Sequence, residues 1–255
     1  MATGPDLFAA WRAQPERAGI LSDFDGTLAE IVDQPEAARP LPGAVDVLAA
    51  LCRRFQRVAV VSGRPVAFLA ERLEVPGLVL SGLYGLESWR DGELTVHPDA
   101  VVWRPVVAAL ADRAQAELPR GVGVERKGLS FGLHVRTRPE YEDTVRAWAS
   151  AVAVESGLVL HEARRSYELR PPLDVDKGTA TAALAGGLAA ACFVGDDRGD
   201  LPAFAALERL AQTTSMAAVR VVAASDETPA SLLAQADLVV EGPHGALELL
   251  RDLAS

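Results

Sequence analysis

The sequence predicts an α/β protein in which a parallel-sheet domain is interrupted by a smaller α+β domain. Apolar strand patterns alternate with helical patterns in residues 18–83, and the same alternation returns in residues 178–240. Between these regions, the pattern changes to closely spaced short strands and longer helices. At 255 residues with 49% hydrophobic content, the chain can form one large packed domain or two modest ones.

The first part of the sheet domain contains three predicted strands joined by helices. In chain order we expect a strand at 18–21, a helix at 44–55, a strand at 58–61, a helix opened by Ser62-Gly63-Arg64-Pro65, and a strand at 78–80. A short amphipathic helix around Trp11 precedes them. Because a helix carries the chain back across the sheet, this alternation indicates parallel strands.

The interrupting segment is predicted to fold around a core of its own. Its elements are a hairpin at 89–93, a helix at 105–117, strands at 122–126 and 131–136, a helix at 139–156, and strands at 158–162 and 166–170. The sheet pattern then resumes with a helix at 178–188, a strand at 191–194, a helix at 202–212, and strands at 219–223 and 238–240. The predicted domains are therefore residues 1–83 with 173–255, and residues 84–172.

Composition narrows the class of partner. The formal charge of −10 argues against nucleic acid or an anionic membrane surface as the main partner. The two cysteines, Cys52 and Cys192, fall in apolar patterns, so we expect buried thiols in a reducing compartment. The sequence has no apolar run of the roughly 18 residues that a membrane span needs, and no signal-peptide pattern at its start. We expect a cytoplasmic monomer that acts on a small molecule.

Reactive side chains follow several of the predicted strands or open the next helix. They are Asp23, Asp25, Ser62, Lys177, Asp196, Asp197 and Asp200. The carboxyl ends of parallel strands lie at one edge of a sheet, where ligands bind. The sequence therefore predicts that these residues form one site.

This set contains each group that phosphoryl transfer to a carboxylate requires. We assign Asp23 as the nucleophile that forms an aspartyl-phosphate. Asp25 is the acid that protonates the leaving oxygen and then the base that activates water. Ser62 and nearby backbone N–H groups can hydrogen-bond the phosphoryl group, while Lys177 supplies positive charge among the carboxylates.

The same residues predict a magnesium site. Hard oxygen ligands from Asp23, the Asp25 backbone carbonyl and Asp196 suit Mg²⁺, with waters completing the octahedron. Asp197 and Asp200 would orient those waters. Each motif alone has a simpler explanation: an acidic loop, a turn, or a solvated lysine. The prediction depends on all of them arriving in order at strand ends.

The order Asp-x-Asp-x-Thr, Ser, Lys and Gly-Asp-Asp-x-x-Asp resembles the haloacid dehalogenase-like phosphatase superfamily. The resemblance covers both halves of the sheet domain. It implies a Rossmann-like parallel-sheet core, a nucleophilic first Asp, an acid–base second Asp, Mg²⁺ as the cofactor, and an inserted α+β cap domain over the site. Residues 84–172 are similar to such a cap.

Three segments, residues 25–38, 125–136 and 167–178, look like trehalose-6-phosphate phosphatases. By this resemblance, the sugar contacts fall on Glu125, Lys127, His134, Arg136 and Glu168, and Arg64 lies near the substrate. The alternative is that the insert residues belong to a solvated sheet face, and that His134 is structural. The chain departs from the common family pattern at Tyr84, Val135 and Gly199.

The predicted activity is Mg²⁺-dependent hydrolysis of trehalose 6-phosphate to trehalose and phosphate, a step of trehalose biosynthesis. Two alternatives stay open. One is a phosphatase for another sugar phosphate, such as sucrose phosphate or glucosylglycerol phosphate. The other is a non-catalytic sensor of sugar phosphates. A nucleotide-binding oxidoreductase is disfavoured, because no Gly-x-Gly-x-x-Gly follows the first strand.

Overall fold

The computed structural model describes residues 6–163 and 165–255, which form two compact units. Unit 1 comprises the described residues of Met1–Ile31, Ala37–Thr95 and Val175–Ser255. Unit 2 comprises Val32–Glu36 and Val96–Asp174. The sequence predicts an inserted domain at residues 84–172, whereas the second segment of unit 2 begins at Val96 and ends at Asp174. The assignment of these units as catalytic core and cap stays a prediction.

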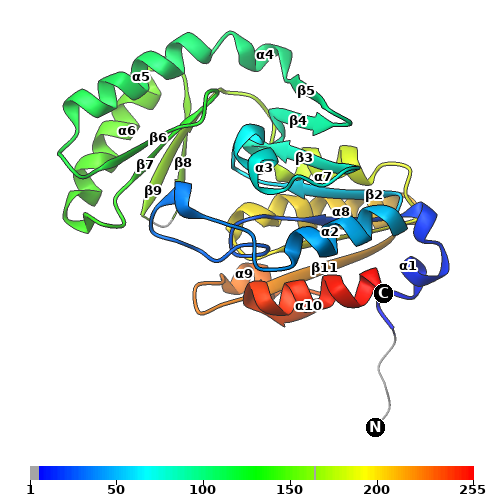
Figure 1. The fold of residues 1–255 in the computed structure, drawn as a ribbon. Coiled ribbons are helices and arrows are strands. Elements are labelled where there is room, and N and C mark those ends of the chain that lie inside the picture. Colours follow the sequence, from blue (N-terminus) through cyan, green and yellow to red (C-terminus); the bar gives the residue numbers. More distant parts are fainter. Residues whose placement is uncertain (1–5, 164) are drawn as a thin grey trace. The chain divides into compact units, whose positions relative to one another are not determined.

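An eight-stranded sheet forms the centre of unit 1, with the strand order β12-β11-β10-β1-β2-β3-β4-β5 (Figure 1). Its strands are β1 (Ala18–Ser22), β2 (Arg57–Val61), β3 (Leu78–Gly82), β4 (Glu87–Arg90), β5 (Glu93–Val96), β10 (Ala190–Gly195), β11 (Ala217–Ala224) and β12 (Leu238–Glu241). The six strands from β12 to β3 pair in parallel. The predicted α/β class with a parallel sheet is confirmed.

Helices cover both faces of this sheet. They are α1 (Ala9–Ala13), α2 (Ala44–Arg54), α3 (Val66–Arg72), α7 (Lys177–Ala185), α8 (Leu201–Thr213), α9 (Ala230–Leu233) and α10 (Gly242–Ala254). Figure 1 shows α2 and α10 on one side of the sheet, with α7 and α8 on the other. Phe204 and Leu207 of α8 pack in one core with Phe193 of β10 and Leu21 of β1. The central strands are therefore buried on both faces, as their uninterrupted apolar sequences indicate.

The hairpin predicted at residues 89–93 is present, but its placement in the inserted domain was wrong. β4 pairs antiparallel with β3, so the hairpin extends the sheet of unit 1. The reason lies in the short connection after β3, where Leu83 and Tyr84 adopt positive φ angles of 49° and 63°. A short connection returns the chain beside the strand that it has just left, and this produces an antiparallel neighbour.

Unit 2 contains a four-stranded antiparallel sheet with the order β6-β7-β9-β8. Its elements are α4 (Pro98–Val101), α5 (Arg104–Glu117), β6 (Gly123–Arg126), β7 (Phe131–His134), α6 (Glu142–Ser156), β8 (Val159–Ala163) and β9 (Ser166–Arg170). Alternate strand residues such as Leu133 and Tyr167 pack with Val107 of α5 and Val145 of α6. The buried side chain of Val135 belongs to the same core. The opposite face of the sheet is left to polar side chains.

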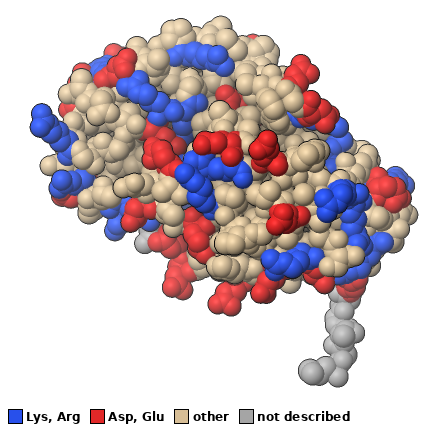
Figure 2. Space-filling model, in the orientation of Figure 1, with Lys and Arg blue, Asp and Glu red and all other residues tan. Residues whose placement is uncertain are grey.

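The remaining compositional expectations concern thiols, charge and membranes. Cys52 and Cys192 are free, and burial raises their pKa values to about 11 and about 12. On the face drawn in Figure 2, acidic and basic side chains are interspersed. Within residues 6–163 and 165–255, every helix is too short or too polar to cross a bilayer.

The predicted helix around Trp11 is present as α1, and the Trp11 indole donates to the Gly19 carbonyl at 2.9 Å.

Candidate functional site

The candidate catalytic residues of unit 1 begin where the two central strands end. β1 ends at Ser22, directly before Asp23, and β10 ends at Gly195, directly before Asp196. The strands are neighbours, and the Asp23 N–H donates to the Val194 carbonyl at 2.8 Å. The chain order of the strands reverses direction between β1 and β10. Ligands bind at such a switch point in open α/β sheets.

Lys177 lies between two buried carboxylates. Its Nζ atom is 2.7 Å from Asp23 Oδ2 and 2.7 Å from Asp200 Oδ1, and its side chain is 3% exposed. The residue is the first of α7, whose start is fixed by a capping box between Asp176 and Thr179. The start of α7 therefore places the Lys177 ammonium group beside the carboxylates that follow β1 and β10.

Four carboxylates gather around this ammonium group. Oxygens of Asp23, Asp196, Asp197 and Asp200 lie within 4.8 Å of one another. Burial raises the pKa of Asp23 well above its ordinary value, with Lys177 opposing the rise and the Asp200 and Asp197 charges adding to it. Burial and the neighbouring carboxylates likewise raise the pKa of Asp196. A hard divalent cation fits this cluster, because its charge would offset the excess of carboxylates.

The same carboxylates act on the lysine. Burial alone would lower the pKa of Lys177, but the charges of Asp200 and Asp23 raise it well above its ordinary value. Lys177 is therefore held as an ammonium ion. Its charge compensates part of the negative charge of the acidic cluster.

Hydrogen bonds from backbone N–H groups to two carboxylates hold the loop after β10 in place. The Asp200 carboxylate accepts from the N–H groups of Asp196 at 2.9 Å and Asp197 at 3.2 Å. Asp197 Oδ1 accepts from the Gly199 N–H at 2.7 Å. Asp197 and Asp200 thus organise the loop that carries Asp196. Their predicted part in orienting metal-bound waters stays a prediction.

Gly26 allows the loop after β1 to pass close to Asp196. Its φ of +71° lies in the left-handed region, and a Cβ atom there would collide with the Asp196 carboxylate. Gly195 has a similar role, since a Cβ atom on it would collide with Asp200. The glycines of both acidic motifs are therefore required by close packing of the carboxylates.

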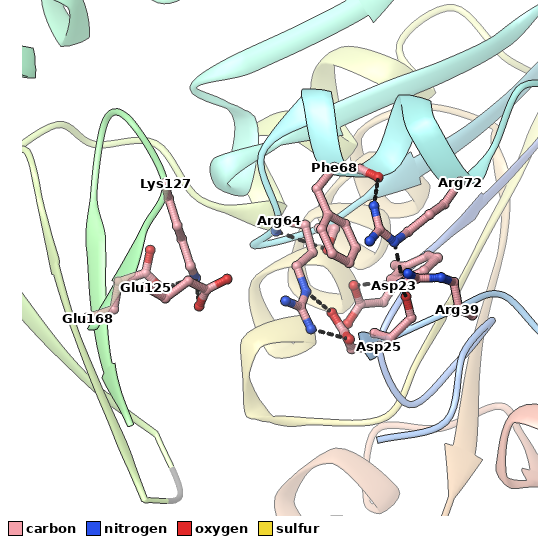
Figure 3. A network of polar contacts seen from close by, with 12 residues as sticks. Asp23, Asp25, Arg39, Arg64, Phe68, Arg72, Glu125, Lys127 and Glu168 are labelled. Atoms are coloured by element: carbon pink, nitrogen blue, oxygen red, sulfur yellow. Dashed lines mark hydrogen bonds and ion pairs between the residues drawn. The ribbon is translucent and has the colours of Figure 1, made fainter. Parts of the chain in front are cut away.

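Asp25 faces a different partner from Asp23. Arg64 Nε lies 2.8 Å from Asp25 Oδ2, and Arg64 Nη2 lies 2.8 Å from Asp25 Oδ1 (Figure 3). The Arg64 N–H donates to the buried Ser62 Oγ at 3.2 Å, which ties this arginine to the loop after β2. The sequence placed Arg64 near the substrate but did not predict its two-point contact with Asp25. Strand-end placement shows that two loops are close, but it cannot show which side chains pair.

The candidate sugar-binding residues gather on the polar face of the sheet in unit 2. Glu125 of β6, Gly132 of β7 and Glu168 of β9 are in register, and a Cβ atom on Gly132 would lie 3.1 Å from His134 Nε2. Lys127 Nζ lies 3.2 Å from Glu168 Oε2 and 3.7 Å from Glu125 Oε2 (Figure 3). His134 Nε2 lies 2.9 Å from Glu125 Oε2. Four of the five predicted residues are therefore joined by direct contacts.

The fifth predicted residue, Arg136, belongs to a cavity in the same unit. The cavity has a volume of about 220 Å³, and its lining includes Glu125, His134 and Arg136. Arg136 Nε lies 3.8 Å from Asp33 Oδ1, in the Val32–Glu36 segment that groups with unit 2. This segment also lines the cavity, a placement that the sequence did not indicate.

Glu168 has two further partners that the sequence did not indicate. Ser130 Oγ donates to Glu168 Oε1 at 2.7 Å, and Arg170 Nη2 lies 3.2 Å from Glu168 Oε2. Burial favours the neutral acid, but Lys127, Arg170 and Ser130 together lower the pKa of Glu168 to about 2. The period-two pattern of a strand would have suggested Arg170, two residues beyond Glu168. Ser130 lies in the connection between β6 and β7, where no such pattern applies.

Replacement of Gly26 by alanine tests the close approach to Asp196. We expect Gly26→Ala to lower the free energy of unfolding by about 2 kcal/mol more than Gly92→Ala. Gly92 is a matched control, because its φ of +87° is also left-handed but a Cβ atom there would meet nothing within 4 Å. Urea unfolding measures both variants. Equal losses would mean that only backbone strain matters at Gly26.

Replacement of Glu168 by glutamine tests its low pKa. The folded-state pKa of about 2 lies below the ordinary 4.5, so ionised Glu168 stabilises the fold above about pH 4.5. This contribution, on the order of 3 kcal/mol, is lost as the pH falls toward about 2.

The difference in unfolding free energy between wild type and Glu168→Gln should therefore shrink between about pH 6 and about pH 3. Urea unfolding across this range measures it. Glu162→Gln is the control, because the Glu162 side chain is 53% exposed. A difference in unfolding free energy between wild type and Glu168→Gln that does not change with pH would contradict the prediction.

Comparisons with known proteins identify the family of the chain. Residues 21–237 match the family model described as trehalose-phosphatase. The trehalose-phosphate phosphatase of Mycobacterium avium (strain 104) is 40% identical over 163 residues, which are 62% of this chain and 41% of that protein. The corresponding protein of Mycobacterium leprae (strain TN) is 37% identical over 163 residues, 62% of this chain and 38% of that protein. The chain thus spans less than half the length of the curated relatives that it matches.

Solved structures share the fold. The C-terminal domain of Candida albicans trehalose-6-phosphate phosphatase has a TM-score of 0.76 at 22% identity, covering 97% of this chain and 95% of that chain. A haloacid dehalogenase-like hydrolase from Bacteroides thetaiotaomicron has a TM-score of 0.63 at 15% identity, covering 92% and 99%. The fold class and the resemblance inferred from the sequence are confirmed. The chain belongs to the trehalose-phosphatase family.

Proposed function

We propose that this protein hydrolyses trehalose 6-phosphate to trehalose and phosphate through an aspartyl-phosphate intermediate, a step of trehalose biosynthesis. The observation that carries the proposal is the buried cluster of Asp23, Lys177, Asp200 and Asp196 at the switch point of the sheet. Family membership and the relatives named as trehalose-phosphate phosphatases support the choice of substrate.

Asp23 is the nucleophile in this proposal. Its two oxygens are oriented separately: Oδ2 contacts Lys177 at 2.7 Å, and Oδ1 accepts from the Phe24 N–H at 2.6 Å. Such contacts hold the carboxylate in one orientation for in-line attack on phosphorus. The Asp23–phosphorus bond forms as the bond from phosphorus to the sugar oxygen breaks. Lys177 and the Ser62 hydroxyl stabilise the charge on the transferring group.

Asp25 moves the protons of both steps. It gives a proton to the departing sugar oxygen and then takes one from the water that attacks the aspartyl-phosphate. Its contact with Arg64 engages both carboxylate oxygens. Proton transfer uses one Asp25 oxygen, so Arg64 releases that oxygen and keeps its contact with the other, which holds the carboxylate in position.

Magnesium is the proposed cofactor. Carboxylate oxygens of Asp23 and Asp196, with the Asp25 backbone carbonyl, would hold the ion, and Asp197 and Asp200 would orient its waters. When bound, Mg²⁺ supplies positive charge that neutralises the phosphoryl oxygens. The four clustered carboxylates fit a hard cation of this kind.

Unit 2 supplies sugar recognition in this proposal. Glu125, Lys127, His134, Arg136 and Glu168 carry charged groups whose donors and acceptors match a disaccharide rich in hydroxyl groups. The contacts of Lys127 with both carboxylates keep these groups in fixed positions. A sugar lacking a matching hydroxyl would leave one of them unpaired, and this selects against it.

A panel of sugar phosphates, assayed with and without Mg²⁺, tests the proposed function. We expect phosphate release from trehalose 6-phosphate with the highest kcat/KM of the panel, and loss of activity with a chelator. Higher kcat/KM on sucrose phosphate or glucosylglycerol phosphate would replace the proposed substrate. No release from any phosphomonoester would favour a non-catalytic sensor.

Asp23→Asn should reduce kcat by a factor of about a thousand or more, because the amide cannot form the intermediate. The matched control is Asp91→Asn, in the turn of the β4–β5 hairpin, which should keep wild-type kcat. Circular dichroism checks that both variants are folded. A folded Asp23→Asn variant with wild-type turnover would remove Asp23 from the mechanism.

A further inference from the structure

Phe68 of α3 is flanked by two guanidinium groups. Arg64 Cζ lies 4.6 Å from the centroid of the Phe68 ring, and Arg72 Cζ lies 3.7 Å from it. Figure 3 shows the two groups on either side of the ring. Phe24 meets the ring edge-on, with centroids 5.9 Å apart and an interplanar angle of 83°. The half-buried ring is therefore contacted by three side chains, those of Arg64, Arg72 and Phe24.

These contacts form a closed path back to the candidate catalytic pair. Phe24 separates Asp23 from Asp25 in the sequence, and it is fully buried. From Phe24 the path runs to Phe68, then to Arg64, whose guanidinium contacts both Asp25 oxygens at 2.8 Å. The ring thus connects the acidic loop with the guanidinium that holds one of its carboxylates.

Arg72 supports the ring and does not replace Arg64. Arg72 Nε donates to the Ala38 carbonyl at 3.0 Å, and Nη1 donates to the Phe68 carbonyl at 3.1 Å. Arg72 Nη1 also lies 2.8 Å from Glu71 Oε2. Its side chain is 8% exposed. These bonds fix Arg72 against the ring, so that Arg64 is left to bridge between the ring and Asp25.

The backbone of Arg64 is already fixed, so its side chain is what the ring can orient. The Arg64 N–H donates to Ser62 Oγ at 3.2 Å, and its carbonyl accepts from the Leu83 N–H at 2.9 Å. A guanidinium must present its edge in the carboxylate plane to form two parallel hydrogen bonds. Stacking on an aromatic face defines the plane of that guanidinium.

We propose that Phe68 is a positioning residue for the phosphatase reaction. Its ring holds the Arg64 guanidinium in the orientation that engages Asp25, and this sets the position from which the acid–base carboxylate acts. The inference rests on the proposed function. Because Asp25 acts in the chemical steps, loss of the ring should affect kcat more than KM.

Three variants test this role with trehalose 6-phosphate as the substrate. Phe68→Leu removes the aromatic face, and we expect it to lower kcat about tenfold while KM changes by less than about twofold. Phe68→Tyr keeps the face and should stay within about twofold of wild-type kcat. Phe55→Leu is the matched control, because it removes the contact of Arg54 with Phe55 at 5.8 Å. It should leave kcat unchanged.

A double-mutant cycle separates positioning from general packing. In an Arg64→Met background, Phe68→Leu should have no further effect on kcat, because the group that it orients is already gone. A tenfold loss that persists in this background would overturn the proposal. Equal losses in Phe68→Tyr and Phe68→Leu would also overturn it, since the aromatic face would then be irrelevant.

One readout does not depend on activity. In the substrate-free protein, the Arg64 Nε–H resonance should show an upfield ring-current shift in wild type and Phe68→Tyr, and lose it in Phe68→Leu. An unchanged resonance in Phe68→Leu would contradict the positioning role. If wild type hydrolyses no phosphomonoester, the proposed function fails, and this resonance alone decides whether Phe68 orients Arg64.

Discussion

The ion pairs of Lys177 with Asp23 and Asp200 are the interaction on which the unit 1 site depends. Burial of an unpaired carboxylate costs several kcal/mol, so two such groups at the strand ends need a cation between them. Lys177 lies 2.7 Å from each. One ammonium group therefore ties the end of β1, the start of α7 and the loop after β10 into a single arrangement.

In unit 2, a buried carboxylate also needs nearby positive charge. Glu168 is buried, and the nearby Lys127 and Arg170 keep it ionised. In each unit, charged groups are held in place by other protein groups before any ligand arrives. This reduces the reorganisation that ligand binding would otherwise require. In the proposed function, the preorganised carboxylates of unit 1 serve phosphoryl transfer, and the paired charged groups of unit 2 serve recognition of hydroxyl groups.

The sequence was sufficient to predict the positions of the main acidic residues, because strand periodicity and parallel pairing determine where each strand ends. Asp23 and Asp196 follow adjacent strands, and the site forms where those strands end. The pairing of Asp25 with Arg64 could not be predicted in this way, since it depends on side-chain rotamers in two different loops.

Other features depended on contacts between distant segments. The local sequence predicts the hairpin after β3. Its pairing with β3 in the large sheet depends on the turn at Leu83 and Tyr84. The stacking of Arg64 on Phe68 depends on the rotation of α3, which hydrophobic periodicity sets only within one helix. Periodicity therefore predicts the elements and their faces, and tertiary contacts decide the partners.

The central claim is that the carboxylate of Asp23 becomes phosphorylated during turnover. Rapid quenching of the wild-type protein with trehalose 6-phosphate and Mg²⁺, followed by peptide mass spectrometry, tests it most directly. We expect the peptide containing Asp23 to gain one phosphoryl group, which fragmentation assigns to this residue. Phosphate release at full rate with no phosphorylated peptide at any quench time, or with the group on another residue, would contradict the account.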